Sequence, residues 1–175
     1  YYERGINSMD KRVLSEKALY FGKVNMPSGF EINREQLKSD ILESRLSGKI
    51  RHSKSLDMLN AYIIENTRLK HKISLVNHQI SGSTLQPEEK TDSYIGVNLM
   101  DLRNSPDFIM IYGVSIQDNS CKILINYDNN RIKSNCHEIS LKNNCFVMFP
   151  ATQTYRIMNE SLDYNHLLCI TYESI

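Results

Sequence analysis

The stretch Asn143–Tyr172, NNCFVMFPATQTYRIMNESLDYNHLLCITY, decides the fold. It begins with a continuous apolar run, Phe146–Phe149, and ends with a second one, Leu167–Tyr172. Short apolar runs that are bounded by turn residues are typical of strands buried against a core. We therefore predict two strands around a polar hairpin, with Tyr155–Met158 continuing the pairing before Asn159–Ser161 turns the chain.

The sequence before this stretch predicts further strands. Apolar or alternating runs that Asn, Asp and Gly residues separate indicate strands at Tyr94–Met100, Phe108–Val114, Cys121–Tyr127 and Glu138–Leu141. A short strand is expected within Lys17–Met26, and period-two alternation indicates another over Leu69–Asn77. Ser81–Ser83 and Gln86–Ser93 are polar and are predicted to form one long loop, of the kind that often borders a site.

Two helices are predicted ahead of most of these strands. Ile32–Leu46 carries apolar residues on one face, with Asn33 as its N-cap and Gly48 at its end. Ser55–Leu69 is a second candidate, with Ser55 available as its N-cap. Helices followed by a series of strands predict a mainly β fold with N-terminal helices, a double-stranded β-helix (a cupin-like jelly roll).

The length of 175 residues fits one domain with its own core. We interpret residues 1–8 as an upstream or added segment, because Met9 followed by Asp-Lys-Arg looks like a natural start. The single jelly-roll domain then spans residues 9–175, with helical support over 30–70 and the β shell over 71–175.

Composition excludes some function classes. A formal net charge of +1 gives no reason to expect a nucleic-acid or membrane-surface partner. No run approaches the roughly 18 apolar residues of a membrane span, and no signal peptide opens the chain, so a cytoplasmic location is expected. The four cysteines lack the C-x-x-C spacing of zinc sites, and Cys145 and Cys169, which sit inside apolar runs, are more simply small buried residues. A homo-oligomer is compatible with this composition.

The C-terminal residues also carry a resemblance to a known family. The phrase LKNNCFVMFPA at Leu141–Ala151, then Tyr155, then N-E-S at Asn159–Ser161 and a closing strand, resembles the 2-oxoglutarate- and Fe(II)-dependent oxygenases, the prolyl-hydroxylase-like branch in particular. The phrases SPDFIMIYGV and INYDNNR are similar to oxygenase-like proteins of marine bacteriophages, which would place the protein in a host cytoplasm. The resemblance extends from about Leu75 to Ile175.

The resemblance implies an iron site made of two histidines and one carboxylate, with open positions for 2-oxoglutarate and oxygen. The family pattern is H-x-D/E on an early strand, a later histidine, and a basic residue beyond it that binds the cosubstrate. Tyr155 stands at the position of the later histidine, and Asn165-His166 stands near the basic position. The early pair should lie in Tyr94–Asp101: either Asp101 matches the carboxylate and Leu99 occupies the histidine position, or Asn98 is the match and the carboxylate is missing.

These replacements argue against the family's chemistry. A neutral phenol is a poor Fe(II) ligand and leucine is none, while histidine lacks the permanent charge and the bidentate geometry of arginine. We therefore predict that the fold persists while the iron site is lost, and the alternative is an alignment shift that hides a working triad. The candidate residues are, as catalytic groups, Tyr155 and His166; as cofactor-binding groups, His166, Asn165, Tyr112 and Tyr127; and as a metal ligand, Asp101.

Other residues give weaker signals. Triads rebuilt as His137-Glu138-His166 or His78-Asp92-His166 are disfavoured, because adjacent strand residues point to opposite faces and because the second set needs the long loop to fold inward. Two arginines, Arg131 and Arg156, are candidates for anion binding. Five tyrosines on predicted strands have two interpretations: they line a pocket, or they pack in the core with satisfied hydroxyls. These residues are Tyr94, Tyr112, Tyr127, Tyr155 and Tyr172.

Three functions compete. The first is an oxygenase-like domain that hydroxylates a small molecule or a peptide side chain, with Fe(II) and 2-oxoglutarate implied by the resemblance alone. The second is a non-enzymatic jelly roll used for binding or for assembly, including assembly of a virus particle. The third is a metal-free cupin-like enzyme in which Tyr155 and His166 act as acid and base.

Overall fold

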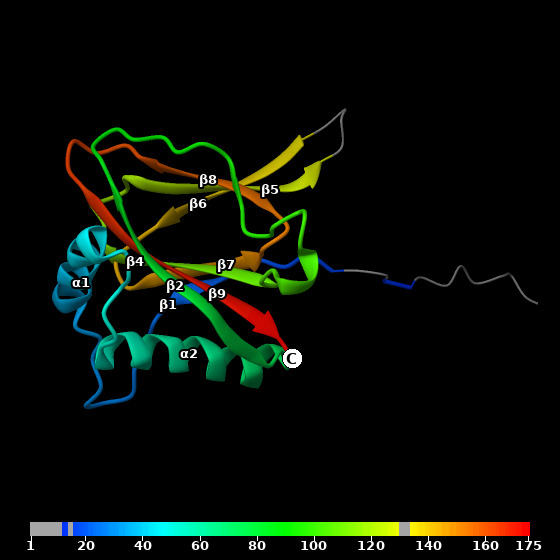
Figure 1. The fold of residues 1–175 in the computed structure, drawn as a ribbon, viewed down its shortest axis with the longest axis horizontal. Helices are drawn as coiled ribbons and strands as arrows, with labels where there is room; N and C mark the ends of the chain where they lie inside the picture. Colours follow the sequence, from blue (N-terminus) through cyan, green and yellow to red (C-terminus); the bar gives the residue numbers. More distant parts are fainter. Residues whose placement is uncertain (1–11, 14–15, 130–133) are drawn as a thin grey trace, which may run out of the picture.

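The computed structural model describes residues 12–13, 16–129 and 134–175, and the strands among them form two antiparallel sheets (Figure 1). The five-stranded sheet contains, in spatial order, β1 (Tyr20–Lys23), β7 (Cys145–Pro150), β4 (Phe108–Ser115), β9 (Asn165–Ser174) and β2 (Leu75–Leu85). The four-stranded sheet contains β3 (Tyr94–Ile95), β8 (Thr154–Asn159), β5 (Cys121–Asn129) and β6 (Ser134–Leu141). Residues 1–8 and Arg131, for which the sequence suggests roles, lie outside the described residues.

The predicted C-terminal hairpin is wrong, because the last three strands, β7, β8 and β9, alternate between the sheets. β7 and β9 both pair with β4, so that Met110 lies between Met148 and Ile170. β8, which lies between β7 and β9 in the sequence, belongs to the other sheet and pairs with β5 and β3. This alternation is consistent with a jelly-roll-like arrangement of two facing sheets.

The first helix agrees closely with its prediction. α1 spans Arg34–Ser47. The side chain of Asn33 accepts a hydrogen bond from the backbone N–H of Gln36 at 3.1 Å, as an N-cap does. Gly48 ends the helix with φ of 76°, a left-handed conformation that glycine adopts without steric cost.

The second helix starts earlier than predicted. α2 spans Lys54–His71, and its N-cap is Ser53, whose hydroxyl accepts from the N–H of Leu56 at 3.2 Å. The predicted cap, Ser55, is buried, and its hydroxyl accepts from the N–H of Asn33 at 2.8 Å. That bond joins the beginnings of the two helices. No helix among the described residues is both long and apolar enough to cross a membrane.

Two predicted boundaries around β2 and β3 are wrong. The strand expected over Leu69–Asn77 begins only at Leu75, because α2 continues to His71. Ser81–Ser83, predicted as loop, belongs to β2 and pairs with β9, which supplies the backbone partners that a polar segment needs to remain extended. The strand expected over Tyr94–Met100 ends at Ile95, and the short 3-10 helix η1 (Leu102–Asn104) follows.

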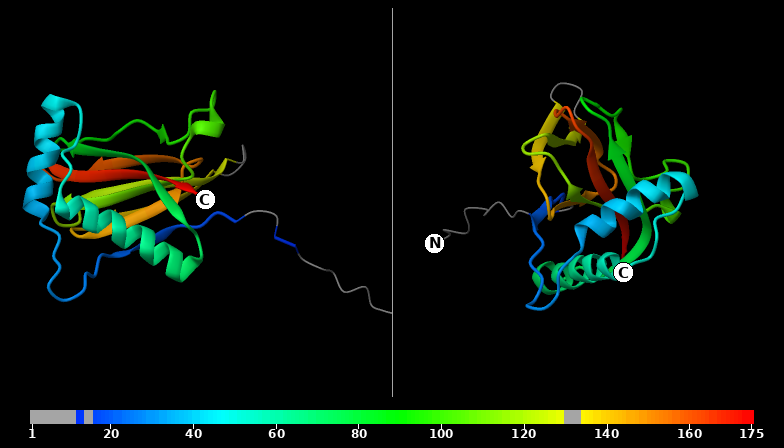
Figure 2. Two further views of the ribbon diagram at one scale, coloured as in Figure 1. Left: turned by 60° about the horizontal axis from the view of Figure 1, so that its bottom comes forward. Right: turned by 90° about the vertical axis from the view of Figure 1, so that its left-hand side faces the viewer.

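The three central strands of the five-stranded sheet, β7, β4 and β9, are covered on both faces, which explains why their sequences are almost continuously apolar. α1 and α2 cover its outer face, where Met110 and Tyr112 of β4 join the first core cluster (Figure 2). The alternate residues Ile109 and Ile111 point between the sheets and join the second cluster, together with Phe149 of β7. The space between the sheets therefore has its own apolar lining.

Candidate functional site

A cavity of about 330 Å³ opens between the two sheets. Its walls come from β2, β4, β9, β3 and β8, and the segment that joins β2 to β3 borders it. Apolar residues of the second core cluster, among them Ile111, Ile157 and Leu167, form part of the lining. Concave sites of this kind, with apolar walls and a few polar groups, are the usual places for ligands in proteins.

Two tyrosines face each other in this cavity. Tyr94 of β3 is paired directly with Tyr155 of β8, and their ring centroids are 5.8 Å apart. The ring of Phe149 meets the Tyr155 ring edge-on at 5.2 Å and fixes its orientation. Burial raises the pKa of Tyr155 far above its ordinary value, and nearby Cys169 and Tyr94 raise it further. The phenol is therefore neutral at physiological pH and can donate a hydrogen bond.

The polar groups of the cavity are mostly uncharged. Ser81 and Ser83 are alternate residues of β2, so their side chains lie on the same side of the sheet. Burial raises the pKa of the Cys169 thiol to about 11, although a hydrogen bond with Ser81 lowers it. Among the described residues that line the cavity, Glu89 carries the one carboxylate, and one of its oxygens accepts from the backbone N–H of Gln86 at 2.9 Å. No lysine, arginine or histidine is among those lining residues.

His166 lies on the other face of β9. Its neighbour Leu167 faces the cavity, while Leu168 belongs to the core beneath the helices, so strand alternation directs His166 toward the helices. Its Nδ1 is 3.1 Å from the hydroxyl of Thr84. Burial lowers the pKa of His166, as do the nearby cations of α1, whereas Asp163 raises it. The structure thus does not bring His166 to Tyr155, and their proposed joint roles as acid and base stay a prediction.

Asn165 holds a turn together. Its side-chain N–H groups donate to the hydroxyl of Ser120 and to the side-chain oxygen of Asn159, both at 2.9 Å. Its own oxygen accepts from the backbone N–H of Gln117 at 2.9 Å. The residue is fully buried, and both of its amide hydrogens are engaged. Its geometry explains a structural role, while the cofactor-binding role implied by the resemblance remains a prediction.

The other candidates lie apart from the cavity. Tyr112 faces the helices, and its hydroxyl donates to the side-chain oxygen of Asn144 at 2.7 Å. Tyr127 is 46% exposed on β5. Asp101 is exposed ahead of η1, where its two carboxylate oxygens accept from the side chain of Asn104 at 3.1 and 2.9 Å.

The alternative triads also remain apart. His78 lies on β2 with Nδ1 3.1 Å from the hydroxyl of Thr171, and His137 lies on the edge strand β6. Across the described part of the chain, no group of three or more His, Cys, Asp or Glu side chains is placed to hold a metal ion. Arg156 is exposed on β8.

Comparison with solved structures places this geometry in context. A prolyl-4-hydroxylase from Pseudomonas putida superposes with a TM-score of 0.60 at 9% identity, over 80% of each chain. An oxidoreductase of the 2OG-Fe(II) oxygenase family from Burkholderia pseudomallei gives 0.52 at 7% identity, over 71% of this chain and 60% of its own. The chain shares the fold of these oxygenases.

A third similar structure is the non-heme alpha-ketoglutarate-dependent epimerase SnoN from nogalamycin biosynthesis. It gives a TM-score of 0.57 at 7% identity, over 89% of this chain and 77% of its own. No protein-family model and no curated protein matches the sequence. The resemblance predicted from the C-terminal residues is therefore confirmed for the fold, while identities this low say nothing about chemistry.

Proposed function

We propose that this chain is an oxygenase-like jelly-roll domain that binds a small, uncharged polar molecule between its sheets and has lost the iron chemistry of the family. The observation that carries the proposal is the pairing of Tyr94 with Tyr155 across β3 and β8, at 5.8 Å between ring centroids. The resemblance expects a metal-binding histidine at Tyr155 and the other two ligands from Tyr94 onward. Two tyrosines stand at this end of the cavity instead.

Fe(II) does not fit the donors of this cavity. The lining offers hydroxyls, a thiol that stays protonated, and the single carboxylate of Glu89, whereas non-heme iron in this family needs two imidazoles and a carboxylate. 2-Oxoglutarate, a dianion, does not fit either, because the described lining residues include no cation to pair with its far carboxylate. These side chains therefore support the binding of a neutral molecule better than they support an iron-dependent reaction.

The same residues suit an uncharged ligand. The rings of Tyr94 and Tyr155 provide flat apolar faces, and the Tyr155 phenol donates a hydrogen bond. Ser81 and Ser83 both donate and accept. Glu89 repels anions from the cavity and accepts hydrogen bonds from hydroxyl or amino groups. A monosaccharide or a nucleoside presents this combination of flat apolar faces and hydroxyls.

Calorimetric titration tests the loss of iron chemistry. Under anaerobic conditions Fe(II) or Mn(II), with and without 2-oxoglutarate, should give no stoichiometric binding, and aerobic incubation should form no succinate above a protein-free blank. One equivalent of bound metal together with succinate formation would instead establish an active oxygenase, the alternative that the shared fold favours.

Nuclear magnetic resonance tests the ligand class. Glucose, adenosine and succinate are titrated in turn against ¹⁵N-labelled protein, and the neutral probes should shift amide signals of β2, β3 and β8 saturably. Replacing Tyr155 by Phe should weaken that binding, whereas His166→Gln, on the other face of β9, should leave it unchanged. Shifts with succinate alone contradict the proposal.

The remaining parts of the interpretation are proposals as well. An origin in a marine bacteriophage, with a host-cytoplasm location, rests on the phrases quoted from the sequence. A non-enzymatic role in assembly, or as a homo-oligomer, is favoured by the apolar loop before η1, where Leu99 is 71% and Met100 95% exposed. Light scattering over a range of protein concentrations tests this role, since a monomer at every concentration would exclude self-assembly.

A further inference from the structure

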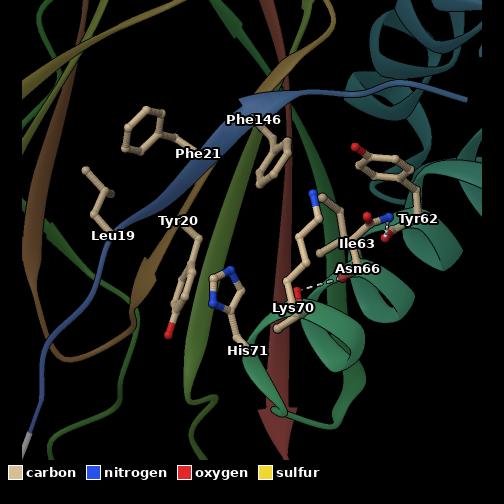
Figure 3. A pocket seen from close by; sticks show the side chains of 10 residues that line it. Leu19, Tyr20, Phe21, Tyr62, Ile63, Asn66, Lys70, His71 and Phe146 are labelled. Atoms are coloured by element: carbon tan, nitrogen blue, oxygen red, sulfur yellow. Dashed lines mark hydrogen bonds between the residues drawn. The ribbon is translucent and has the colours of Figure 1, made fainter.

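A second concave site lies on the far side of the five-stranded sheet, between the edge strand β1 and α2 (Figure 3). It is separate from the cavity between the sheets and does not depend on the proposed function. It encloses about 210 Å³. Tyr20 packs against His71 at one end, with ring centroids 4.6 Å apart and ring planes tilted by 58°, and Tyr62 meets Phe146 edge-on at 6.5 Å at the other.

Gly22 leaves room between these two ring pairs. Alternation along β1 places Gly22 on the same side as Tyr20, facing α2. A Cβ at Gly22 would lie 3.6 Å from the Phe146 ring, which is ordinary contact, and the backbone there needs no left-handed conformation. The strand can therefore accept a side chain at this position, which would lie against Phe146, one of the residues that line the pocket.

The outer edge of β1 offers backbone groups for strand pairing. The N–H and C=O of Val24 both bond to Asn144 on the inner side, at 2.9 and 3.0 Å. Antiparallel alternation then directs the backbone groups of Phe21 and Lys23 outward. The Tyr62 hydroxyl reaches the Lys23 carbonyl at 3.4 Å, which agrees with that direction, and the Phe21 side chain is 65% exposed. In the sheet formed by the described strands, β1 has a paired strand on one side only.

The charges beside β1 determine which peptides can bind at its edge. Lys70 of α2 lines the pocket, and its side chain extends along it in Figure 3. Among the described residues no carboxylate lies within ion-pair distance of Lys70. An acidic side chain beside the pocket would pair with Lys70, whereas a basic one would be repelled.

We propose that the groove between β1 and α2 binds an extended acidic peptide segment, which adds a strand to the edge of β1. The peptide backbone pairs with Phe21 and Lys23, a bulky apolar side chain enters the pocket beneath Gly22, and an Asp or Glu two positions away meets Lys70. Residues two apart on a strand share a face, so both side chains point to α2. Main-chain bonds to a sheet edge combined with pockets for alternate side chains are a recurrent way to recognise peptides.

Selection from a displayed library of random decapeptides tests the proposal, with the whole chain as the target. Enriched peptides should share an apolar residue and an acidic residue two positions apart. Fluorescence polarisation of labelled clones should show a loss of affinity of roughly tenfold or more for Gly22→Leu, which adds a bulky side chain against Phe146 of the pocket, and for Lys70→Glu, which reverses the charge. Methylation of alternate peptide nitrogens should cause a similar loss.

Two features keep the outcome decisive. Ser140→Leu adds the same side chain to another edge strand, β6, and should bind like the wild type. Lys70 is an exposed helix residue, so its replacement reports on binding even if Gly22→Leu melts early. A selection that enriches no shared pattern overturns the proposal. Peptides that bind both variants as tightly as they bind the wild type also overturn it. So do N-methylated peptides that bind the wild type as tightly as the unmethylated ones.

Discussion

His166 illustrates how a single buried residue couples this fold to pH. It is 5% exposed, and its ring is 3.1 Å from the Thr84 hydroxyl. Burial lowers its pKa, and the cations Lys38 and Arg45 of α1 lower it further. The folded chain therefore favours the neutral imidazole more than the unfolded chain does, where the ordinary pKa is 6.5.

The sign of the resulting pH dependence follows from linkage. As the pH falls below 6.5, the unfolded chain gains a proton at His166 that the folded chain does not bind, so the free energy of unfolding decreases until the folded pKa is passed. Urea titrations at pH 7.5 and 5.5 should therefore show a smaller loss of stability for His166→Gln than for the wild type. His52→Gln, at an exposed site, is the control. Equal losses in all three proteins would contradict this account.

Asn165 should be the more costly single replacement in β9. Asn165→Ala removes three hydrogen bonds of 2.9 Å and takes away the acceptor of the Gln117 N–H, while Ser120 and Asn159 keep their other hydrogen bonds. We expect the free energy of unfolding to fall by about 3 kcal/mol, since each of the three lost hydrogen bonds contributes about 0.5–1.5 kcal/mol. Chemical denaturation measures it. Asn104→Ala, which loses bonds on the surface, should change stability by less than about 0.5 kcal/mol.

The sequence identifies some residues of the site, but it does not show which of these residues are in contact. Tyr94 and Tyr155 are among the tyrosines that the sequence offers for a pocket, and they do meet across β3 and β8. The sequence groups His166 with Tyr155 because a linear pattern does not show which face of a strand a residue occupies. Sequence reasoning misses Ser81, Ser83 and Glu89 as lining residues. The alternation of Ser81, Ser83 and Leu85 is the available signal.

At the scale of elements, the packing of α1 on β2 depends on a residue without a side chain. A Cβ on Gly82 would lie 2.8 Å from Cγ1 of Ile41, closer than real contacts allow. Ile41 is completely buried and has little room to move. Gly82 therefore sets how closely the helix approaches the sheet.

Replacing Gly82 by Ala should consequently destabilise the protein. Overpacking of this kind costs about 1–3 kcal/mol, because the helix or the strand must shift. Thermal unfolding should show a lower Tm for Gly82→Ala. The same change at Gly22, where a Cβ meets only ordinary contact at 3.6 Å, should leave the Tm nearly unchanged. The account fails if the two variants melt together.

Most elements can be predicted from sequence, and the exceptions have a common cause. α1 and its caps follow from local signals, as do β4, β5 and β7, whose apolar runs are long and bounded by turns. β2 is only partly predictable because Ser81–Ser83 has no strand-like composition. Its extended form depends on pairing with β9, a strand more than eighty residues away. The composition of a segment does not show which distant strand it pairs with.

At the scale of the whole molecule, the connectivity is the part that local patterns do not give. β7 and β9 are continuous apolar runs because both of their faces are covered, and such runs do not tell which strand is their neighbour. Their closeness in the sequence suggests that they pair around a hairpin. In the structure, β4, which comes much earlier in the chain, lies between them. The last strands therefore pair with a strand from the middle of the sequence.

This arrangement makes β4 common to both cores, and that predicts how the molecule unfolds. Met110 packs beneath the helices and Ile111 packs between the sheets, although the two are adjacent in one strand. Loss of either core removes a face of the same sheet, so we expect one cooperative transition. Circular dichroism at 222 nm, which reports the helices, and near-ultraviolet dichroism of the buried tyrosines should give the same midpoint in urea. Met110→Ala and Ile111→Ala should each lower that common midpoint, at a cost of about 2–5 kcal/mol. If the helical signal instead disappears first in Met110→Ala while the tyrosine signal persists, the helices and the β shell are separate cooperative units, and β4 does not couple them.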